Sequence, residues 1–277
     1  MKYNLHTHSE FCDGIAPLSH HCEFAISQNL KVLGFSSHAP LRFNNNFSIK
    51  ESQIDKYISE TDLCQEKFNK ELVLKKGLEC DYIKGLSYSF SEFKTKYNLD
   101  YIIGGIHLVG ENDPKKLWFI DGPQKAIFDD GLEKLYQNDI KRAVTSYFHQ
   151  MNEMIENEEF DILAHIDKIK MHNQSRFFRE NEIWYQNLID ETLELVQSKD
   201  LITEVNYRGI YKKRCMDFYP SKQILQKMKA KNIRICISSD SHQPSEIGLL
   251  DKEAIDFVKS VGYKETYCLD QCVPLPN

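Results

Sequence analysis

Short apolar runs alternate with helix-like segments along almost the whole chain. Seven runs are expected to be strands, because apolar, β-branched and aromatic residues dominate them and turn-forming residues bound them. They cover residues 3–6, 32–36, 72–78, 101–106, 160–164, 201–205 and 233–237. Between the runs, apolar residues recur at helical spacing, as in Ile140, Ala143, Val144 and Tyr147. Strands that alternate with amphipathic helices are typical of a parallel α/β sheet.

One connection, residues 109–131, is longer than the others and contains Asp113-Pro114 and Asp121-Gly122-Pro123 turns. Long connections in compact domains are often functional, so this one is a candidate lid. No internal repeat, low-complexity stretch or Pro/Gly/Ser linker interrupts the alternation. We therefore expect a single domain over residues 1–277.

Side chains that can bind metals stand at or just after the ends of the predicted strands. His6 and His8 are two residues apart, which on a strand directs both imidazoles to one face. Asp240 and His242 form a similar pair near the other end of the chain. The full candidate ligand set is His6, His8, Asp13, His38, Glu79, His107, His165, Asp240 and His242. Only a closed barrel brings such strand ends to one centre, so the set favours a (β/α)7 barrel over an open sheet, which periodicity alone does not distinguish.

Imidazole and carboxylate ligands together suit zinc, iron or manganese and do not suit calcium. Nine ligands exceed the needs of one tetrahedral ion, so we expect two or three clustered divalent ions, bridged by Glu79 and Asp240. A single histidine at a strand end is more often structural, and Asp13 beside Gly14 also fits a loop cap. The combination is what indicates a metal site. The other histidines, His20, His21, His149 and His172, are interpreted as surface or structural residues.

Composition narrows the class of protein. The formal net charge of −6 argues against a nucleic-acid partner. No apolar run approaches the roughly 20 residues that a membrane span needs, and the N-terminus lacks a signal-like apolar region, so we expect a cytoplasmic protein. The eight cysteines include no C-x-x-C pair and are expected to be thiols. Cys12 and Cys80 adjoin candidate ligands, and a thiolate ligand would favour zinc.

Clustered cations stabilise charge on the attacking and leaving oxygens of a phosphoryl group, so hydrolysis of a phosphate ester fits best. Arg208 follows a predicted strand end, where its guanidinium could bind phosphate in a bidentate manner rather than serve as a solvated charge. Further candidate phosphate contacts are Asn206, Lys168 and Arg176. Asp240 and His242 are candidates for moving a proton to the leaving group.

Six motifs carry a resemblance: His6-Thr7-His8-Ser9, Ser37-His38-Ala39-Pro40, Gly77-Leu78-Glu79-Cys80, Gly105-Ile106-His107, Ala164-His165-Ile166-Asp167 and Ser239-Asp240-Ser241-His242. Supporting stretches lie at residues 118–122, 167–173 and 204–213. In order and spacing the chain resembles the polymerase-and-histidinol-phosphatase (PHP) superfamily, and within it the histidinol-phosphate phosphatases. In the first loop, where several members have a histidine, this chain has Asp13.

The resemblance implies a distorted (β/α)7 barrel with a trinuclear metal centre. It also implies hydrolysis of L-histidinol phosphate to L-histidinol and phosphate, the penultimate step of histidine biosynthesis. The amine and imidazole of that substrate would need acidic or polar partners, for which Asp81, Glu10 and Asp121 are candidates.

Two other functions stay open. One is another phosphoesterase of the same superfamily, a nucleotide phosphatase or an exonuclease, which the acidic composition disfavours. The other is a non-catalytic metal-binding accessory domain, which the complete ligand set disfavours.

Overall fold

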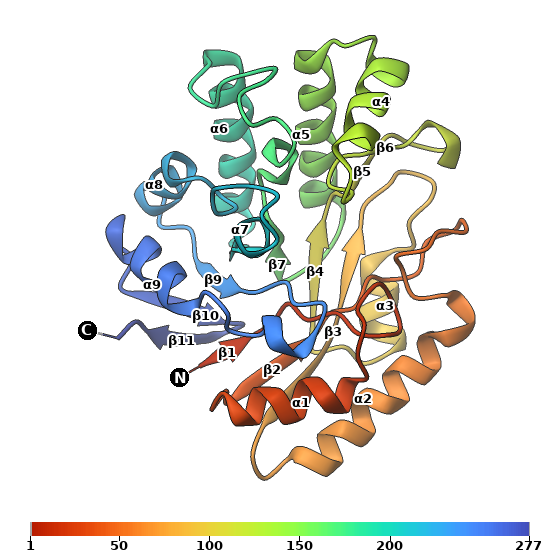
Figure 1. The fold of residues 1–277 in the computed structure, drawn as a ribbon, viewed down its shortest axis with the longest axis vertical. Coiled ribbons are helices and arrows are strands. Elements are labelled where there is room, and N and C mark those ends of the chain that lie inside the picture. The colour runs from red at the N-terminus through yellow and green to blue at the C-terminus, as the bar shows by residue number, and fades with distance from the viewer. Residues whose placement is uncertain (1, 277) are drawn as a thin grey trace.

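A parallel sheet of seven strands forms the centre of the computed structural model, which describes residues 2–276. The strands follow one another in the order β1 (Tyr3–Asn4), β2 (Val32–Phe35), β3 (Val73–Asp81), β4 (Tyr101–Gly105), β7 (Ile162–Leu163), β8 (Ile202–Asn206) and β9 (Ile235–Ser238). Beyond β1 and β9, Thr7 and Ser241 form a parallel bridge, in which the His8 amide donates to Ser241 O at 2.8 Å. The sheet thus curls into the predicted, nearly closed (β/α)7 barrel (Figure 1).

Helices surround the strands (Figure 1). They are α1 (Leu18–Ser27), α2 (Ile54–Phe68), α3 (Phe90–Lys96), α4 (Lys125–Tyr136), α5 (Ile140–Asn157), α6 (Ile183–Ser198), α7 (Arg208–Tyr211), α8 (Lys222–Ala230) and α9 (Asp251–Ser260). Short 3-10 turns are η1 (Glu51–Gln53), η2 (Pro114–Lys116), η3 (Lys168–Lys170) and η4 (Pro244–Glu246). The predicted apolar positions of α5, including Ala143, Val144 and Tyr147, are buried against the sheet side of the molecule. None of the helices in the described part of the chain is long and apolar enough to cross a membrane.

The barrel interior is filled by side chains around Tyr101, which is fully buried and donates to the carbonyl oxygens of Leu5 and Phe35. Two strand glycines make room for this ring. A Cβ atom on Gly34 would lie 2.3 Å from the Tyr101 hydroxyl oxygen, and one on Gly77 would lie 2.6 Å from its ring. The interior is therefore a packed core and the functional surface has to lie at its rim.

A hairpin of β10 (Glu265–Cys268) and β11 (Gln271–Pro274) completes the chain. Cys268 and Val273 from this hairpin join the interior cluster around Tyr101. This hairpin thus helps to cover the barrel core.

The candidate lid over residues 109–131 has secondary structure of its own. The strands β5 (Leu108–Val109) and β6 (Trp118–Phe119) form an antiparallel pair there, and the start of α4 follows. Trp118 and Phe128 are buried, and Trp118 Nε1 donates to Phe128 O at 2.9 Å. These aromatic side chains fold the segment into a packed wall beside the barrel mouth.

Candidate metal centre

The structure brings all nine predicted ligand residues together at the carboxyl end of the barrel. They come from the chain beyond β1, β2, β4, β7 and β9 and from β3 itself, which runs on through Asp81, so that Glu79 lies inside the strand. His165 and Asp240 have positive backbone φ values of 21° and 51°. Such a conformation is unfavourable for residues other than glycine and is concentrated at functional sites.

Eight of the nine residues form three overlapping groups, within each of which the ligand atoms lie within 4.8 Å of one another, whereas His165 belongs to none of them and lies against Glu79. The groups are His8, Asp13, His38 and His242; His6, His8 and Asp240; and His38, Glu79 and His107. His8 and His38 belong to two groups each, so the three positions are contiguous. Cys12 and Cys80 belong to none, although Cys12 Sγ lies 3.5 Å from His8 Nδ1. All eight cysteines are free thiols.

Glu79 and Asp240 connect the groups. Glu79 Oε2 lies 3.1 Å from His6 Nε2 and 3.3 Å from both His8 Nε2 and His38 Nδ1. Its second oxygen, Oε1, lies 3.1 Å from His165 Nε2. Asp240 Oδ1 lies 3.4 Å from His8 Nε2. Both carboxylates therefore stand where bridging ligands are needed.

Three of the imidazole nitrogens that face these carboxylates, His6 Nε2, His8 Nε2 and His38 Nδ1, are buried without a hydrogen-bond partner among residues 2–276. Buried polar atoms are normally bonded, so unpaired nitrogens converging on carboxylate oxygens indicate a missing partner that accepts lone pairs. Mixed imidazole and carboxylate donors suit divalent transition-metal ions. The residues present thus fit the metal ions that the sequence predicts, while the individual ligand roles stay predictions.

Burial lowers the pKa of the histidines in this centre, whereas the neighbouring carboxylates raise it. Burial alone would lower the pKa of His6, but Glu79, Glu204 and Asp240 raise it to about 10. Burial likewise disfavours charged His107, yet Asp81 and Glu79 raise its pKa to about 9. For His38 burial prevails over Glu79 and lowers the pKa to about 4. The metal-free centre is therefore a mixed set of charged and neutral imidazoles around ionised carboxylates.

Two further carboxylates hold the ligand histidines from behind. Glu204 on β8 is fully buried, and its Oε1 lies 2.5 Å from His6 Nδ1. Asp81 Oδ1 lies 2.8 Å from His107 Nδ1 and accepts the His107 amide at 3.0 Å. The sequence predicts Glu204 only as a strand residue and Asp81 as a candidate substrate contact. A carboxylate inside the apolar run Ile202-Thr203-Glu204-Val205 was the signal that could have identified Glu204, because unpaired carboxylates are rarely buried.

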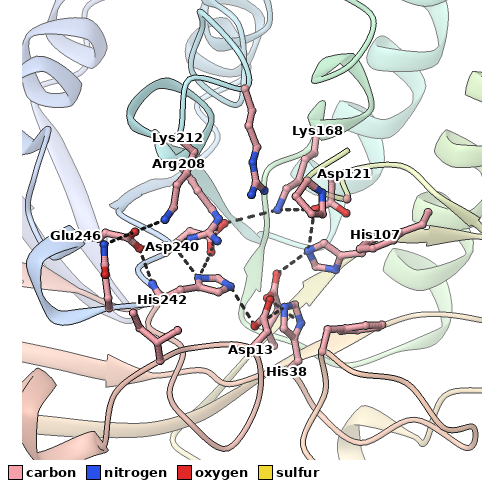
Figure 2. A pocket seen from close by; sticks show the side chains of 18 residues that line it. Asp13, His38, His107, Asp121, Lys168, Arg208, Lys212, Asp240, His242 and Glu246 are labelled. Atoms are coloured by element: carbon pink, nitrogen blue, oxygen red, sulfur yellow. Dashed lines mark hydrogen bonds and ion pairs between the residues drawn. The ribbon is translucent and has the colours of Figure 1, made fainter. Parts of the chain in front are cut away.

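A pocket of about 280 Å³ opens over this centre. Figure 2 shows Arg208, Lys212 and Glu246 on one side of it and Lys168, Asp121 and His107 on the other. Arg208 Nη1 donates to Asp240 O at 2.7 Å and lies 3.6 Å from Glu246 Oε2. Lys168 Nζ lies 3.0 Å from Asp121 Oδ2 and 3.6 Å from Asp240 Oδ2. Burial disfavours the charge on Lys168, but Asp121 and Asp240 raise its pKa above the ordinary value, so it stays cationic.

Two of the predicted phosphate contacts lie elsewhere. Asn206 is fully buried, is not among the pocket-lining residues, and donates to Glu204 and Asp240 at 3.0 and 3.1 Å. Arg176 forms a bidentate pair with Asp129 at 2.7 and 2.9 Å and does not line the pocket either. The structure therefore removes Arg176 from the predicted phosphate set and makes Asn206 a residue that orients carboxylates.

Of the other histidines, His20 and His149 are exposed, whereas His21 and His172 are buried outside the centre. His172 Nε2 lies 2.8 Å from Gly122 O, beside the pocket. Glu10, a candidate substrate contact, is exposed and does not line the pocket, whereas Asp121 does.

Known proteins are similar to this chain in fold and, at low identity, in sequence. The histidinol-phosphatase of Bacillus subtilis is 21% identical in an alignment of 269 residues that covers 89% of this chain and 96% of the relative. A Listeria monocytogenes protein proposed to be a histidinol phosphatase superposes with a TM-score of 0.79 at 22% identity, over 89% of this chain and 97% of its own. The histidinol phosphate phosphatase of Lactococcus lactis, solved with zinc, L-histidinol and phosphate, gives 0.67 at 20% identity, over 98% of both chains.

The model of the PHP domain matches residues 4–208. This span holds seven of the nine candidate ligands, all except Asp240 and His242. With a match over more than half of its length, the chain belongs to the PHP domain family.

Proposed function

We propose that this chain is a metal-dependent phosphatase that hydrolyses L-histidinol phosphate to L-histidinol and phosphate in histidine biosynthesis. The observation that carries the proposal is the joining of the nine-residue centre to a pocket whose inner wall carries Arg208 and Lys168. The names of the relatives and the ligands bound to the Lactococcus lactis protein support the choice of substrate.

The residues that would hold divalent ions are the nine candidate ligands, with Glu79 and Asp240 between positions. When bound, such ions supply Lewis-acid stabilisation of a phosphoryl group and lower the pKa of water. Arg208, with a side chain only 13% exposed, would bind non-bridging phosphoryl oxygens through its planar donors. Asp240 and His242, at the pocket floor, would move a proton towards the leaving oxygen.

The leaving group would occupy the side of the pocket formed by Phe47 and Phe119. Their rings are stacked at 6.1 Å between centroids, and Phe47 also meets His38 edge-on at 5.3 Å. Both side chains pack on a buried apolar cluster that includes Leu41, Ile83 and Leu108. A planar imidazole lying on this aromatic surface would gain apolar contact without a rearrangement of the wall.

The direct test compares phosphate release from L-histidinol phosphate, mononucleotides and short oligonucleotides, each with added Mn, Zn or Fe. We expect turnover of L-histidinol phosphate to exceed the others and to vanish with a chelator. Preference for a nucleotide or an oligonucleotide would instead identify another PHP-type phosphoesterase. Absence of turnover, with less than one metal ion per chain, would favour a non-catalytic role.

Arg208→Gln tests the phosphate assignment. We expect it chiefly to raise KM for phosphate esters, roughly tenfold or more, because a charged hydrogen bond contributes about 1.5–3 kcal/mol. The metal content should stay at the parent value. An unchanged KM would reject the role given to Arg208, whereas loss of metal would show that its bond to Asp240 O mainly supports the centre.

A further inference from the structure

Arg214 lines the same pocket, in the connection between α7 and α8, and is not among the predicted site residues. The other three cations of the pocket are committed to carboxylates. Lys168 contacts Asp121 and Asp240, Arg208 lies beside Asp240 and Glu246, and Lys212 contacts Glu246. Within residues 2–276, the guanidinium of Arg214 has no hydrogen bond to a side chain and no carboxylate within 4.0 Å.

The backbone of Arg214, in contrast, is fixed. Its amide and that of Cys215 both donate to Gly209 O, at 2.9 and 3.0 Å, and Gln174 Nε2 donates to Arg214 O at 3.1 Å. Cys215 is buried against Met171 and Tyr219. Gly209 directly follows Arg208, so one carbonyl group ties the position of Arg214 to that of Arg208.

A fixed backbone with an uncommitted guanidinium at a pocket wall is suited to an anionic ligand. Because the other three cations of the pocket are paired with carboxylates, an incoming anion can meet the charge of Arg214 without displacing a carboxylate. Phosphate matches best, because the planar donors of arginine fit its oxygens and a phosphate dianion can accept from two arginines at once. Arg208, already bonded to Asp240 O, can use only its remaining donors, and Arg214 can use all of its own.

We propose that Arg214 is a second phosphate-binding residue, which contacts the phosphoryl group from the outer side of the pocket while Arg208 contacts it from the inner side. The inference rests on the proposed function in taking a phosphate monoester as the ligand, and it adds a residue that none of the predicted contacts included. Arg214 acts on capture and retention of the phosphoryl group, not on proton transfer.

The test uses the metal-loaded protein with Arg214→Gln and Arg214→Lys. Inorganic phosphate is the binding probe, measured by calorimetry, and KM and kcat are measured for L-histidinol phosphate and for phosphoethanolamine, which has no ring. In Arg214→Gln we expect the Kd of phosphate and both KM values to rise about tenfold, with kcat within about twofold of the parent. Arg214→Lys should recover part of the loss, and the salt dependence of phosphate binding should weaken in Arg214→Gln.

Lys213→Gln is the matched control, because Lys213 is the adjacent residue, is exposed and does not line the pocket. It should leave phosphate affinity unchanged, and all variants should keep the parent metal content and unfolding midpoint. An unchanged phosphate Kd in Arg214→Gln overturns the inference, and so does a KM increase confined to one of the two substrates, which would place Arg214 on the leaving group. If the parent binds phosphate but hydrolyses no monoester, the proposed function fails while the Kd comparison still decides the role of Arg214.

Discussion

At the scale of single residues, the centre depends on which nitrogen of each histidine faces inward. Glu204 lies against His6 Nδ1 and Asp81 against His107 Nδ1, so each ring presents Nε2 to Glu79, at 3.1 and 3.4 Å. A carboxylate behind a ligating imidazole fixes the tautomer and the ring orientation, and it makes the ligand more basic. Glu204 also accepts from Asn206 and the His165 amide, and so links three positions of the rim.

Glu204→Gln should therefore weaken metal binding although Glu204 belongs to none of the ligand groups. The amide keeps the shape but removes the charge that holds the His6 proton, and loss of such a partner typically costs roughly 10- to 100-fold in metal affinity or activity. Metal content after dialysis and a chelator competition measure the effect. Asp200→Asn serves as control, since Asp200 pairs with Arg234 away from the pocket. Parent-like metal affinity in Glu204→Gln would contradict the role.

His21 on α1 makes a separate residue-scale prediction about acid stability. It is fully buried against Phe35, and burial lowers its pKa to about 4, whereas an unfolded chain takes up the proton near 6.5. Above pH 6.5 the His21 ring is neutral in both states and does not lower stability. As the pH falls towards 4, the unfolded chain takes up the proton first, and the free energy of unfolding falls by at most about 3 kcal/mol. In metal-free protein, urea unfolding of His21→Leu should show a smaller loss between pH 6.5 and 4 than the parent. Parallel curves for the two proteins would exclude this role.

Sequence reasoning grouped the candidate ligands because all of them except Asp13 belong to motifs at or near predicted strand ends, and strand ends meet in a barrel. It misplaced Arg176 because the partner that withdraws it, Asp129, lies on α4, and nothing local in the sequence shows that pairing. Arg214 was missed for the opposite reason. Only the absence of a partner distinguishes it from a surface arginine, and that can be seen only in three dimensions.

At the scale of elements, β2 and β3 are shaped by one side chain from β4. Tyr101 occupies the space that side chains at Gly34 and Gly77 would fill, and its hydroxyl donates to the backbone carbonyls of Leu5, just after β1, and Phe35 in β2. The apolar pattern predicts these strands. It does not predict that Gly34 and Gly77 are needed because the Tyr101 side chain fills the space beside them.

Gly34→Ala should destabilise the barrel by about 2–3 kcal/mol, since overpacking of a filled core costs about 1–3 kcal/mol and the new Cβ would meet the Tyr101 hydroxyl at 2.3 Å. Chemical denaturation measures the change. Tyr101→Phe in the same chain removes the clashing oxygen, so the double variant should be more stable than the sum of the single effects implies. Val73→Ala, at an exposed position of β3, should change stability by less than about 0.5 kcal/mol. Additive effects of Gly34→Ala and Tyr101→Phe would contradict the packing argument.

The segment at residues 109–131 shows the limit of reading turns from sequence. Asp113 precedes the short 3-10 turn η2 and the chain bends at Asp121, but Trp118, Ile120 and Phe128 between and after these positions are buried. Tertiary packing of these apolar side chains therefore decides the structure of the segment, and its residues Phe119, Asp121 and Gly122 form part of the pocket wall.

At the scale of the whole molecule, the centre takes ligands from both ends of the chain. His6 and His8 lie next to the bridge that joins residues 7 and 241, and Asp240 and His242 lie on its other side. The site therefore exists only when the barrel closes, and metal binding is linked to folding. Metal ions that bind this centre have to displace the protons on its charged histidines.

Metal binding should release protons at neutral pH. The pKa values of about 10 for His6 and about 9 for His107 mean that both rings are charged at pH 7 without metal, whereas a ligating imidazole has to be neutral. One proton from each ring should therefore appear when metal binds, and apparent metal affinity should rise as the pH increases from 7 to 9. Calorimetric titration of Mn²⁺ at pH 7, in buffers of different ionisation enthalpy, measures the release. His107→Ala should lower the release by about one proton per chain, because it removes one of the charged rings. Metal binding without proton release would contradict the assignment of His6 and His107 as ligands, because a ring that stays protonated cannot bind a metal ion.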